Sequence, residues 1–298
     1  METTTMKIVI TGANGLLGQK IVKQLLKKNV PFLATSTGEN RNPDCPADHY
    51  VEMDICNKAQ VTQVIEQFCP THVIHTAAMT NVDACELNPE QCHQINVVGT
   101  QNVFEATQKV NAHFQLLSTD FVFDGQKGNY TEEDAVNPLS VYAQSKVDAE
   151  NLLLKGNYSN YSIVRTIIVY GNAHHLSRSN LFLWAKSALP KGEQMNVVDD
   201  QFRAPTWAND LAWGCIRICE LNERGIYHLS GPTTFSIFEI VERIARYYNY
   251  DTKLLNKISS ATLSQPAARP PKTGFDLTKA RKNLGYQPKT IEETLDLF

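Results

Sequence analysis

The sequence predicts an α/β protein with a doubly wound parallel sheet of the Rossmann type and a smaller C-terminal lobe. Short β-branched runs alternate with amphipathic helical segments up to Gly171, which is the pattern of strands joined by crossover helices. The run Ile-Val-Ile at 8–10 is apolar without alternation and therefore suits a strand buried on both faces. After Gly171 the alternation becomes irregular, which predicts the second lobe.

The spacing of the apolar residues predicts the individual elements. We expect strands at 7–11, 32–35, 50–53, 72–75 and 114–117, and a sixth that begins at Ile163. We expect one helix that begins near Leu17 and a second that contains Val61 and Phe68. Further helices are expected at 95–106, 142–154, 181–189, 237–247 and 277–284. Residues 1–171 would form the Rossmann domain, rejoined by part of 205–235, and 172–298 would form mainly the substrate-binding lobe.

Composition narrows the class of protein. The 298 residues are 42% hydrophobic and 20% charged, with a net charge of -3, which gives no reason to expect nucleic acid or a membrane surface as partner. Seven cysteines without a C-x-x-C pair favour a reducing, cytoplasmic compartment over a disulfide framework. The polar segment 1–5 predicts no signal peptide. His174-His175 lacks a third ligand at useful spacing, so we expect no metal site.

A glycine-rich turn between the first strand and the first helix is the first candidate site. Gly12 would form the tight turn, Gly15 would let the backbone approach a pyrophosphate, and Gly18 would let the helix pack on the strand. The following helix N-terminus would offer free N–H groups to phosphates. The turn therefore predicts dinucleotide binding, with Asn14, Leu16 and Leu17 as further members of the site.

The residues after the second and third strands bear on the choice of cofactor. Ser36 follows the second strand without an adjacent carboxylate, and Arg41 could pair with a 2′-phosphate. We therefore expect NADP(H) to be preferred. NAD(H) is possible, because Glu39 is close in sequence and a carboxylate in this region favours NAD. Asp54 could meet the adenine amino group or cap the helix that starts near Asn57. The neighbouring Ile55, and Leu117 in the fifth strand, are expected to line the same groove.

A Tyr-x-x-x-Lys pair supplies candidate catalytic residues. Tyr142 and Lys146 are four residues apart in an expected helix and so project from one face. A positive charge on Lys146 would lower the pKa of Tyr142 from about 10, and a tuned tyrosine could protonate the alkoxide formed when a carbonyl is reduced. Thr119 ends the fifth strand, at the sheet edge where ligands of open α/β sheets bind.

With these motifs the chain resembles the extended short-chain dehydrogenase/reductase family and, more narrowly, the dTDP-4-dehydrorhamnose reductases. The resemblance extends nearly from end to end. The stretches that carry it are 75–83 (HTAAMTNVD), 95–102 (INVVGTQN), 118–125 (STDFVFDG), 200–206 (DQFRAPT) and 269–276 (RPPKTGFD).

The resemblance implies roles for individual residues. Thr119 and Tyr142 would grip a sugar 4-keto oxygen with Tyr142 as the acid, and Lys146 would bond the nicotinamide ribose. Asp120 would contact the sugar, and Asn96 would support the site from its helix. The residues expected to line the cofactor after the fourth strand are Thr76, Ala77 and Ala78.

The chain departs from the family pattern on the expected sugar side. Ile168 stands where the family reductases usually carry Trp, and Arg203 stands where the Asp-Gln-x-Gly-x-Pro-Thr pattern has Gly. Asn180 is also assigned to this side. Arg269 could pair with the substrate pyrophosphate or bridge the two lobes.

Three functions follow as hypotheses. The first is an NADPH-dependent reductase of a nucleotide-linked 4-keto-6-deoxy sugar, because Asp120 is followed by Phe121 where related dehydratases carry Asp-Glu. The second is a non-catalytic NADP-binding regulatory subunit like the beta subunit of methionine adenosyltransferase. The third is a nucleotide-sugar epimerase. A homodimer is possible on the frequency of dimers among soluble proteins.

Overall fold

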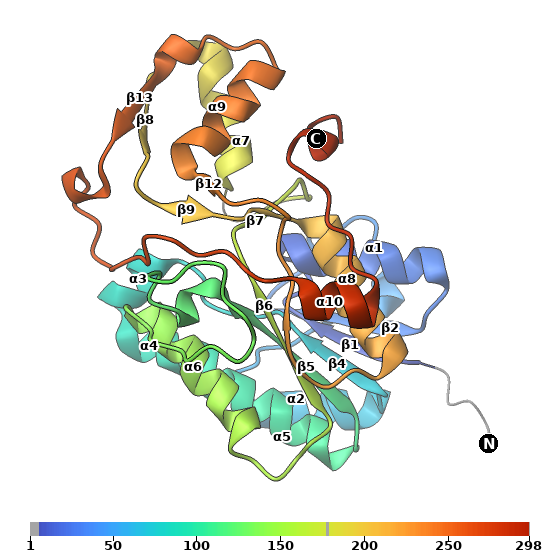
Figure 1. The fold of residues 1–298 in the computed structure, drawn as a ribbon. Coiled ribbons are helices and arrows are strands. Elements are labelled where there is room, and N and C mark those ends of the chain that lie inside the picture. The colour runs from blue at the N-terminus through green and yellow to red at the C-terminus, as the bar shows by residue number, and fades with distance from the viewer. Residues whose placement is uncertain (1–5, 177–178, 298) are drawn as a thin grey trace.

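The computed structural model describes residues 6–176 and 179–297, so the polar segment 1–5 lies outside the described residues. A seven-stranded sheet with the order β11-β6-β5-β4-β1-β2-β3 organises the larger domain (Figure 1). Every neighbouring pair of its strands is parallel, which confirms the predicted fold class. The strands are β1 (Ile8–Thr11), β2 (Phe32–Ser36), β3 (Tyr50–Glu52), β4 (His72–His75), β5 (His113–Thr119), β6 (Tyr161–Thr166) and β11 (Gly225–His228).

Helices cover both faces of this sheet because successive strand side chains point to opposite faces. In β1, Ile8 and Ile10 join one core with Ile21 of α1, while Val9 joins a second core with Val61 of α2. The first face carries α1 (Leu16–Lys28), α8 (Ala208–Leu221) and α10 (Thr278–Leu284), and the second carries α2 (Lys58–Phe68), α5 (Thr100–Lys109) and α6 (Val141–Leu154).

The segment predicted as one helix at 95–106 contains a change of helical type. A π-helix at Gln94–Gly99 (η2) runs directly into α5. It follows α3 (Val82–Leu87) and α4 (Pro89–His93), and it packs against α6. π-turns of this kind are frequent at functional sites.

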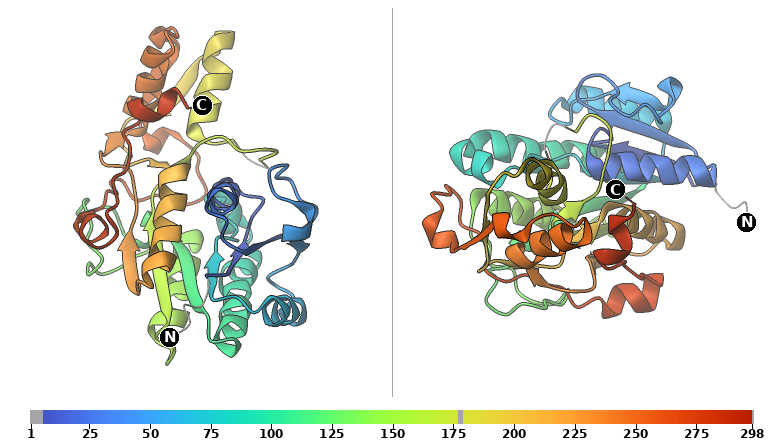
Figure 2. Two further views of the ribbon diagram at one scale, coloured as in Figure 1. Left: turned by 90° about the vertical axis from the view of Figure 1, so that its right-hand side faces the viewer. Right: turned by 90° about the horizontal axis from the view of Figure 1, so that it is seen from above.

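The second lobe has its own hydrophobic core, and it lies above the sheet domain in Figure 1 and in the left view of Figure 2. Helices α7 (Leu181–Ala188) and α9 (Ile237–Tyr247) pack beside the parallel pair β8 (Met195–Val198) and β13 (Leu255–Ile258). The capping box that Ser236 and Glu239 form at the start of α9 fixes where this helix begins. The short α11 (Glu292–Leu295) completes this core.

The chain passes repeatedly between the two cores. Leu211 and Leu229 belong to the sheet core, although residues earlier in the chain, such as Phe182, already belong to the core of the second lobe. Phe275 and Tyr286 return to the sheet core, and Ile291 then joins the second. Two short strand pairs lie between the lobes, formed by β7 (Val169–Tyr170) with β10 (Thr206–Trp207) and by β9 (Phe202–Arg203) with β12 (Phe235–Ser236).

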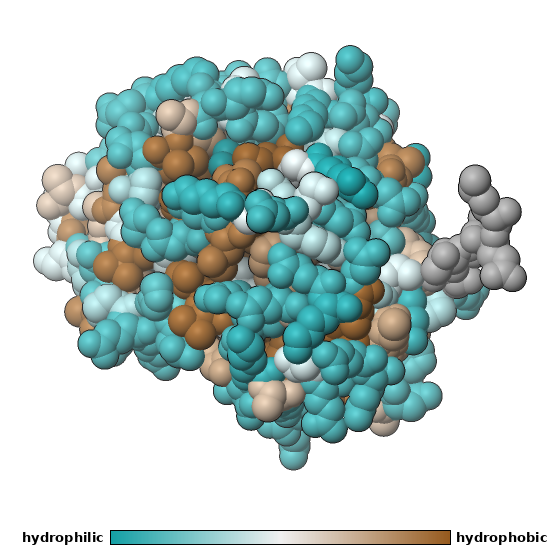
Figure 3. Space-filling view, turned by 90° about the horizontal axis from the view of Figure 1, so that it is seen from below, coloured by the Kyte–Doolittle hydropathy of each residue, from teal (hydrophilic) through white to brown (hydrophobic). Residues whose placement is uncertain are grey.

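The surface has the mixture of side chains that is usual for a globular protein. Seen from below, hydrophobic side chains form several patches among hydrophilic ones (Figure 3). Large exposed hydrophobic side chains include Leu87, Leu139 and Leu154, and single exposed residues of this kind are normal. None of the helices in the described ranges combines the length and the apolar character that a membrane span requires.

Candidate active site

A cavity of about 870 Å³ lies where the carboxyl ends of the central strands meet the second lobe. This is the edge at which open α/β sheets bind ligands. The cavity combines glycine backbone, hydroxyl groups and ionisable side chains, among them the buried Lys146. Its lining includes Gly12, Gly15, Leu16, Leu17, Gly18, Ser36, Arg41, Asp54, Ile55, Thr76, Ala77, Ala78, Leu117, Thr119, Tyr142, Lys146, Ile168 and Asn180.

A side chain would have a different steric effect at each glycine of the turn after β1. Gly12 has a φ of +70°, and a Cβ there would lie 2.7 Å from the nitrogen of Ala77. A Cβ on Gly18 would lie 2.5 Å from the carbonyl oxygen of Gly12, so helix α1 could not pack on the turn. Gly15 has ordinary extended geometry, and its Cβ would meet only that same oxygen, at 3.2 Å. Of the three, Gly15 is thus the glycine that keeps space free at the cavity.

Asn14 points away from the cavity and is 1% exposed. Its amide nitrogen donates to the carbonyl oxygen of Glu39 at 2.9 Å and to the Tyr50 hydroxyl at 3.2 Å, and its oxygen accepts from the backbone nitrogen of Arg41 at 2.8 Å. Asn14 is outside the lining of the cavity, and its assignment to the cofactor site stays a prediction. Asn14 holds the loop that presents Arg41.

Ser36, Thr37 and Arg41 line the cavity. The Arg41 guanidinium contacts the carbonyl oxygen of His175 at 3.4 Å, and Glu39 is outside the lining. A carboxylate that the sequence reasoning missed, Glu52, accepts the backbone N–H of Gly38 at 3.1 Å. This part of the cavity thus offers hydroxyls and one cation to an anion.

The two interpretations of Asp54 can now be separated. The N-cap of α2 is Asn57, whose side chain accepts from the backbone nitrogen of Gln60 at 3.2 Å, so the capping interpretation of Asp54 is wrong. The Asp54 carboxylate accepts from the backbone nitrogen of Cys56 at 2.9 Å and lines the cavity beside Ile55.

Thr119, Tyr142 and Lys146 line the same cavity. Helix α6 begins after Ser140, whose hydroxyl accepts from the backbone nitrogen of Ala143 at 3.3 Å, and this start sets the face on which Tyr142 and Lys146 lie. Burial raises the pKa of the Tyr142 phenol, against an opposing hydrogen bond with Thr119. Burial also lowers the pKa of Lys146 to about 8.

The phenol of Tyr142 is therefore protonated near neutral pH. The expectation that Lys146 lowers its pKa is wrong for this structure, because removing the phenolate from water dominates. A protonated phenol is the form that can donate a proton to a developing alkoxide.

Asn96 ties together the elements behind these side chains. It lies in the π-helix with 0% exposure. Its amide nitrogen donates to the carbonyl oxygen of Met79 at 3.0 Å and to the Ser145 hydroxyl at 2.9 Å, and its oxygen accepts from the Met79 nitrogen at 2.8 Å. It thereby links the loop after β4 to α6 next to Lys146, without lining the cavity itself.

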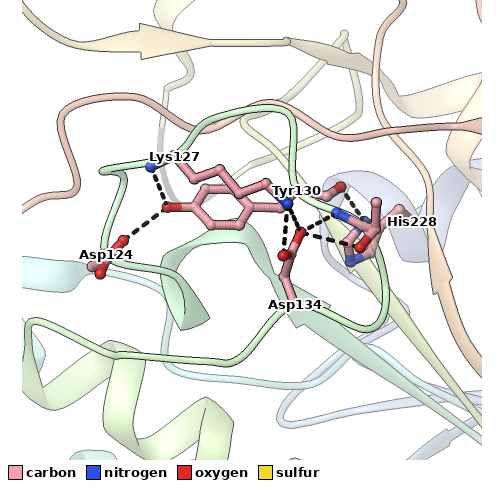
Figure 4. A network of polar contacts seen from close by, with 6 residues as sticks. Asp124, Lys127, Tyr130, Asp134 and His228 are labelled. Carbon is pink, nitrogen blue, oxygen red and sulfur yellow. Dashed lines mark hydrogen bonds and ion pairs between the residues drawn. The ribbon is translucent and has the colours of Figure 1, made fainter.

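The loop between β5 and α6 is held by a second network (Figure 4). The Tyr130 hydroxyl donates to Asp124 at 2.8 Å, and Lys127 contacts Asp134 at 2.6 Å. His228 of β11 pairs with the Tyr130 carbonyl oxygen at 3.1 Å. The segment that separates Thr119 from Tyr142 is thus fastened to the sheet.

Asp120 and Arg203, both expected at the sugar, point away from the cavity. Asp120 is 2% exposed and accepts from the Thr119 hydroxyl at 3.1 Å and from the Thr273 hydroxyl. Arg203 is buried beside it, with Nε 3.7 Å from the carboxylate. Neither lines the cavity, so their assignment to the substrate stays a prediction. The orientation of these two side chains depends on Pro270 and Thr273, which lie more than 60 positions away in the chain.

The three other residues expected on the sugar side have different surroundings. Ile168 lines the cavity with a φ of +24°, which is uncommon for a β-branched residue. Asn180 lines it while capping α7, where its oxygen accepts two backbone N–H groups at 3.1 Å. Arg269 forms a bidentate pair with Asp83 of α3 at 2.7 and 3.0 Å, so it bridges the C-terminal segment to the sheet domain.

Sequence reasoning left part of the cavity lining unassigned. Met79, Thr80, Val82, Gln91 and Ile95 line the cavity, and all except Gln91 lie in the stretches 75–83 and 95–102 that carry the family resemblance, although no site role was assigned to them. Among the described residues, no group of three or more His, Cys, Asp or Glu could hold a metal ion.

The family model for the RmlD substrate binding domain matches residues 6–298. The chain belongs to this family. The dTDP-4-dehydrorhamnose reductase of Aggregatibacter actinomycetemcomitans is 33% identical, over 97% of both chains. The crystal structure of dTDP-4-dehydrorhamnose reductase from Bacillus anthracis in complex with NADP has a TM-score of 0.86 at 29% identity and covers 99% of both chains.

The RmlD family match confirms the predicted resemblance to dTDP-4-dehydrorhamnose reductases. A relative with a different name is also similar: the beta subunit of methionine adenosyltransferase 2 from Xenopus laevis is 28% identical, over 97% of this chain and 87% of its own length. The RmlD-type architecture is therefore shared by proteins with different names, and the side chains in the cavity must decide the function.

Proposed function

We propose that the protein is an NADPH-dependent reductase of a nucleotide-linked 4-keto-6-deoxy sugar, of the dTDP-4-dehydrorhamnose reductase type. The observation that carries the proposal is the convergence of Thr119, Tyr142 and Lys146 in one cavity with the glycine turn. The names of the RmlD-family relatives support the choice of substrate class.

The residues along the cavity suit NADP(H). Gly15 leaves room for a diphosphate at the N-terminus of α1, where backbone N–H groups and the helix dipole favour anions. Ser36 and Arg41 would hold the 2′-phosphate, and Asp54 and Ile55 would lie near the adenine. When bound, the dinucleotide supplies a hydride to the carbonyl carbon.

The protein supplies the proton and the alignment. Thr119 and Tyr142 hold the carbonyl oxygen, and Tyr142 donates its phenolic proton to that oxygen as the alkoxide forms. Its phenol is protonated at neutral pH, and burial raises its pKa further above the ordinary value. Lys146 holds a positive charge beside it below pH about 8, which stabilises the phenolate left after transfer.

Turnover of NADPH tests the proposal. Purified protein mixed with NADPH and dTDP-4-keto-6-deoxy sugar should consume cofactor at a rate that follows the sugar concentration. Tyr142→Phe should lose at least about a hundredfold in kcat, as expected when a general acid is removed, and should still bind NADPH. Tyr247→Phe is the matched control, because this tyrosine is exposed on α9. Full turnover by Tyr142→Phe would show that the acid is another group.

A regulatory subunit is the second candidate, favoured by the similarity to the methionine adenosyltransferase beta subunit. It predicts NADP binding without turnover on dTDP-, GDP- or UDP-linked keto sugars, and stoichiometric assembly with a catalytic partner. Sugar-dependent oxidation of NADPH by the isolated chain would exclude this candidate. An epimerase would instead retain its cofactor through purification and show no net oxidation.

The compartment and assembly that we propose are the cytoplasm and a homodimer. Seven cysteines without a C-x-x-C pair suit a reducing compartment, and twofold dimers are the most frequent closed assemblies. Sedimentation of the purified chain tests the dimer, and fractionation of the source cells tests the compartment.

A further inference from the structure

An irregular segment leads from the sheet domain towards the second lobe and passes beside the start of α1. It follows β7 and comprises residues 171–176, which form neither helix nor strand. Lys20 of α1 contacts it at the surface, where the lysine Nζ lies 3.1 Å from Oδ1 of Asn172. The way in which this segment is held bears on the cavity, because the segment also contacts the cavity-lining Arg41.

Gln19 is a buried anchor for this segment. It lies in α1, one helical turn after Gly15, and is 4% exposed. Its Oε1 accepts from the backbone nitrogen of His174 at 2.9 Å, and its Nε2 donates to the carbonyl oxygen of the same residue at 2.8 Å. One carboxamide thus satisfies both backbone polar groups of a residue 155 positions away in the chain.

The same carboxamide also reaches the glycine turn. Its Nε2 donates to the carbonyl oxygen of Asn14 at 3.1 Å, while the side-chain oxygen of Asn14 accepts from the backbone nitrogen of Arg41 at 2.8 Å. The loop at 38–41 and the segment at 171–176 are therefore both fastened to the glycine turn and the helix that follows it. These bonds join groups that are buried or partly buried, where losing one partner leaves a costly unsatisfied polar atom.

The two fastened stretches meet at Arg41. Its Nη1 donates to the carbonyl oxygen of His175 at 3.4 Å, and His175 directly follows the residue that Gln19 holds. The contacts close a ring, in which Gln19 and Asn14 hold the two stretches and Arg41 joins them. Arg41 is thereby oriented at its backbone from one side of the ring and at its guanidinium from the other.

A carbonyl oxygen orients a guanidinium without neutralising its charge. The contact with His175 uses Nη1 alone, so the other N–H groups of the planar fork stay available to a phosphate. A carboxylate in the same place would instead cancel the charge that attracts the phosphate. An arginine that is held before its ligand arrives also loses less side-chain entropy on binding.

We propose that Gln19 is a positioning residue for cofactor selectivity: by holding this segment, it lets the carbonyl oxygen of His175 pre-orient Arg41 for the 2′-phosphate of NADP(H). The inference rests on the proposed function, which assigns Arg41 to that phosphate. Gln19 itself is outside the lining of the cavity and acts through the segment. Its loss should therefore weaken the binding of NADPH, which carries the 2′-phosphate, and spare the binding of NADH, which lacks it.

Calorimetry of NADPH and NADH binding to the purified chain tests the inference. Gln19→Met keeps the length of the side chain and removes its hydrogen bonds. We expect it to raise the Kd for NADPH by about twofold to fivefold and to leave the Kd for NADH within about 1.5-fold of the parent value. Gln24→Met is the matched control, because Gln24 also lies in α1 and donates to a distant carbonyl oxygen, that of Asn209 at 2.8 Å. The control should leave both dissociation constants unchanged.

A double-mutant cycle shows whether Gln19 acts through Arg41. In the Arg41→Met background, Gln19→Met should leave the ratio of the two dissociation constants unchanged, because the group that it positions is absent. Gln19→Asn serves as the second variant should Gln19→Met fail to fold. Its amide is one carbon shorter and cannot reach both backbone groups of His174, so it should show the same selective loss of NADPH affinity.

Three results would overturn the inference. Equal losses of NADPH and NADH affinity in Gln19→Met would place its role at the glycine turn, which both cofactors share. An unchanged ratio of the two constants would show that Arg41 does not depend on Gln19. A further change of this ratio in the Arg41→Met background would assign the effect to another group.

The same binding data separate this inference from the assignment on which it rests. A selective loss of NADPH affinity in Arg41→Met, with none in Gln19→Met, refutes the role of Gln19 and leaves the 2′-phosphate assignment standing. An unchanged ratio in Arg41→Met refutes both. Neither result depends on turnover, because no sugar is present in the measurement.

Discussion

Replacing Gly15 by Ala should separate cofactor binding from folding. Gly15 has φ -78° and ψ 167°, a conformation that alanine adopts freely, and its Cβ would meet only the Gly12 oxygen, at 3.2 Å. Gly→Ala at a compatible position typically stabilises by about 0.4–1 kcal/mol, and this one close contact would offset part of the gain. We therefore expect the free energy of unfolding to change by less than about 1 kcal/mol.

Gly15→Ala should instead weaken the binding of the dinucleotide. The new methyl group would stand in the cavity where a diphosphate approaches the backbone. Losing one charge-assisted hydrogen bond costs about 1.5–3 kcal/mol, and about 1.4 kcal/mol corresponds to tenfold in Kd. The Kd for NADPH should thus rise by about tenfold to a hundredfold.

Calorimetry of NADPH binding, with chemical denaturation of the same sample, measures both quantities. Gly18→Ala is the contrasting variant, because its Cβ would lie 2.5 Å from the Gly12 oxygen and 2.6 Å from the Ala13 Cα. That variant should lose stability as well as affinity. An unchanged Kd in Gly15→Ala would refute the assignment of this turn to the diphosphate.

The remaining predictions concern charge. Arg41→Met should weaken NADPH binding by about threefold to tenfold and leave NADH binding unchanged; equal losses for both cofactors by calorimetry would contradict the 2′-phosphate assignment. Because burial lowers the pKa of Lys146 to about 8 and its charged form assists the reaction, kcat/KM should fall as pH rises through this value; a flat profile up to pH about 9.5 would argue against its role. Arg165→Met should lower the free energy of unfolding by about 3–5 kcal/mol, since Glu150 pairs with Arg165 at 2.7 Å and both are buried. Arg165→Met/Glu150→Leu should recover most of that loss in urea denaturation, and failure to recover would assign the loss to packing.

The parallel sheet could be predicted because its signals are local. Strands such as β1 are continuous apolar runs, and the glycine turn follows at once. The four-residue spacing of Tyr142 and Lys146 holds in any helix. The π-turn around Asn96 could not be foreseen, because one extra residue in a helical turn leaves the apolar pattern nearly intact.

Side-chain direction could not be predicted where distant segments decide it. The Asp120 carboxylate points inward because Thr273 donates a hydrogen bond to it and Arg203 pairs with it. Both partners come from the last third of the chain. Asn14 turns away from the cavity because its side chain is engaged by Glu39 and Arg41 of the loop at 38–41 and by the Tyr50 hydroxyl. In both cases the residue type was compatible with ligand contact, and long-range packing gave it another partner.

The repeated passage of the chain between the two cores limits how this scaffold can be re-engineered. The sheet core takes Leu229 and Phe275 from stretches that flank the second core's Phe238 and Leu255. A foreign sugar-binding module could not be exchanged as one contiguous cassette, because any single cut would remove sheet residues with it. Changing sugar selectivity would require several short replacements, each matched to fixed anchor points such as the Arg269–Asp83 pair.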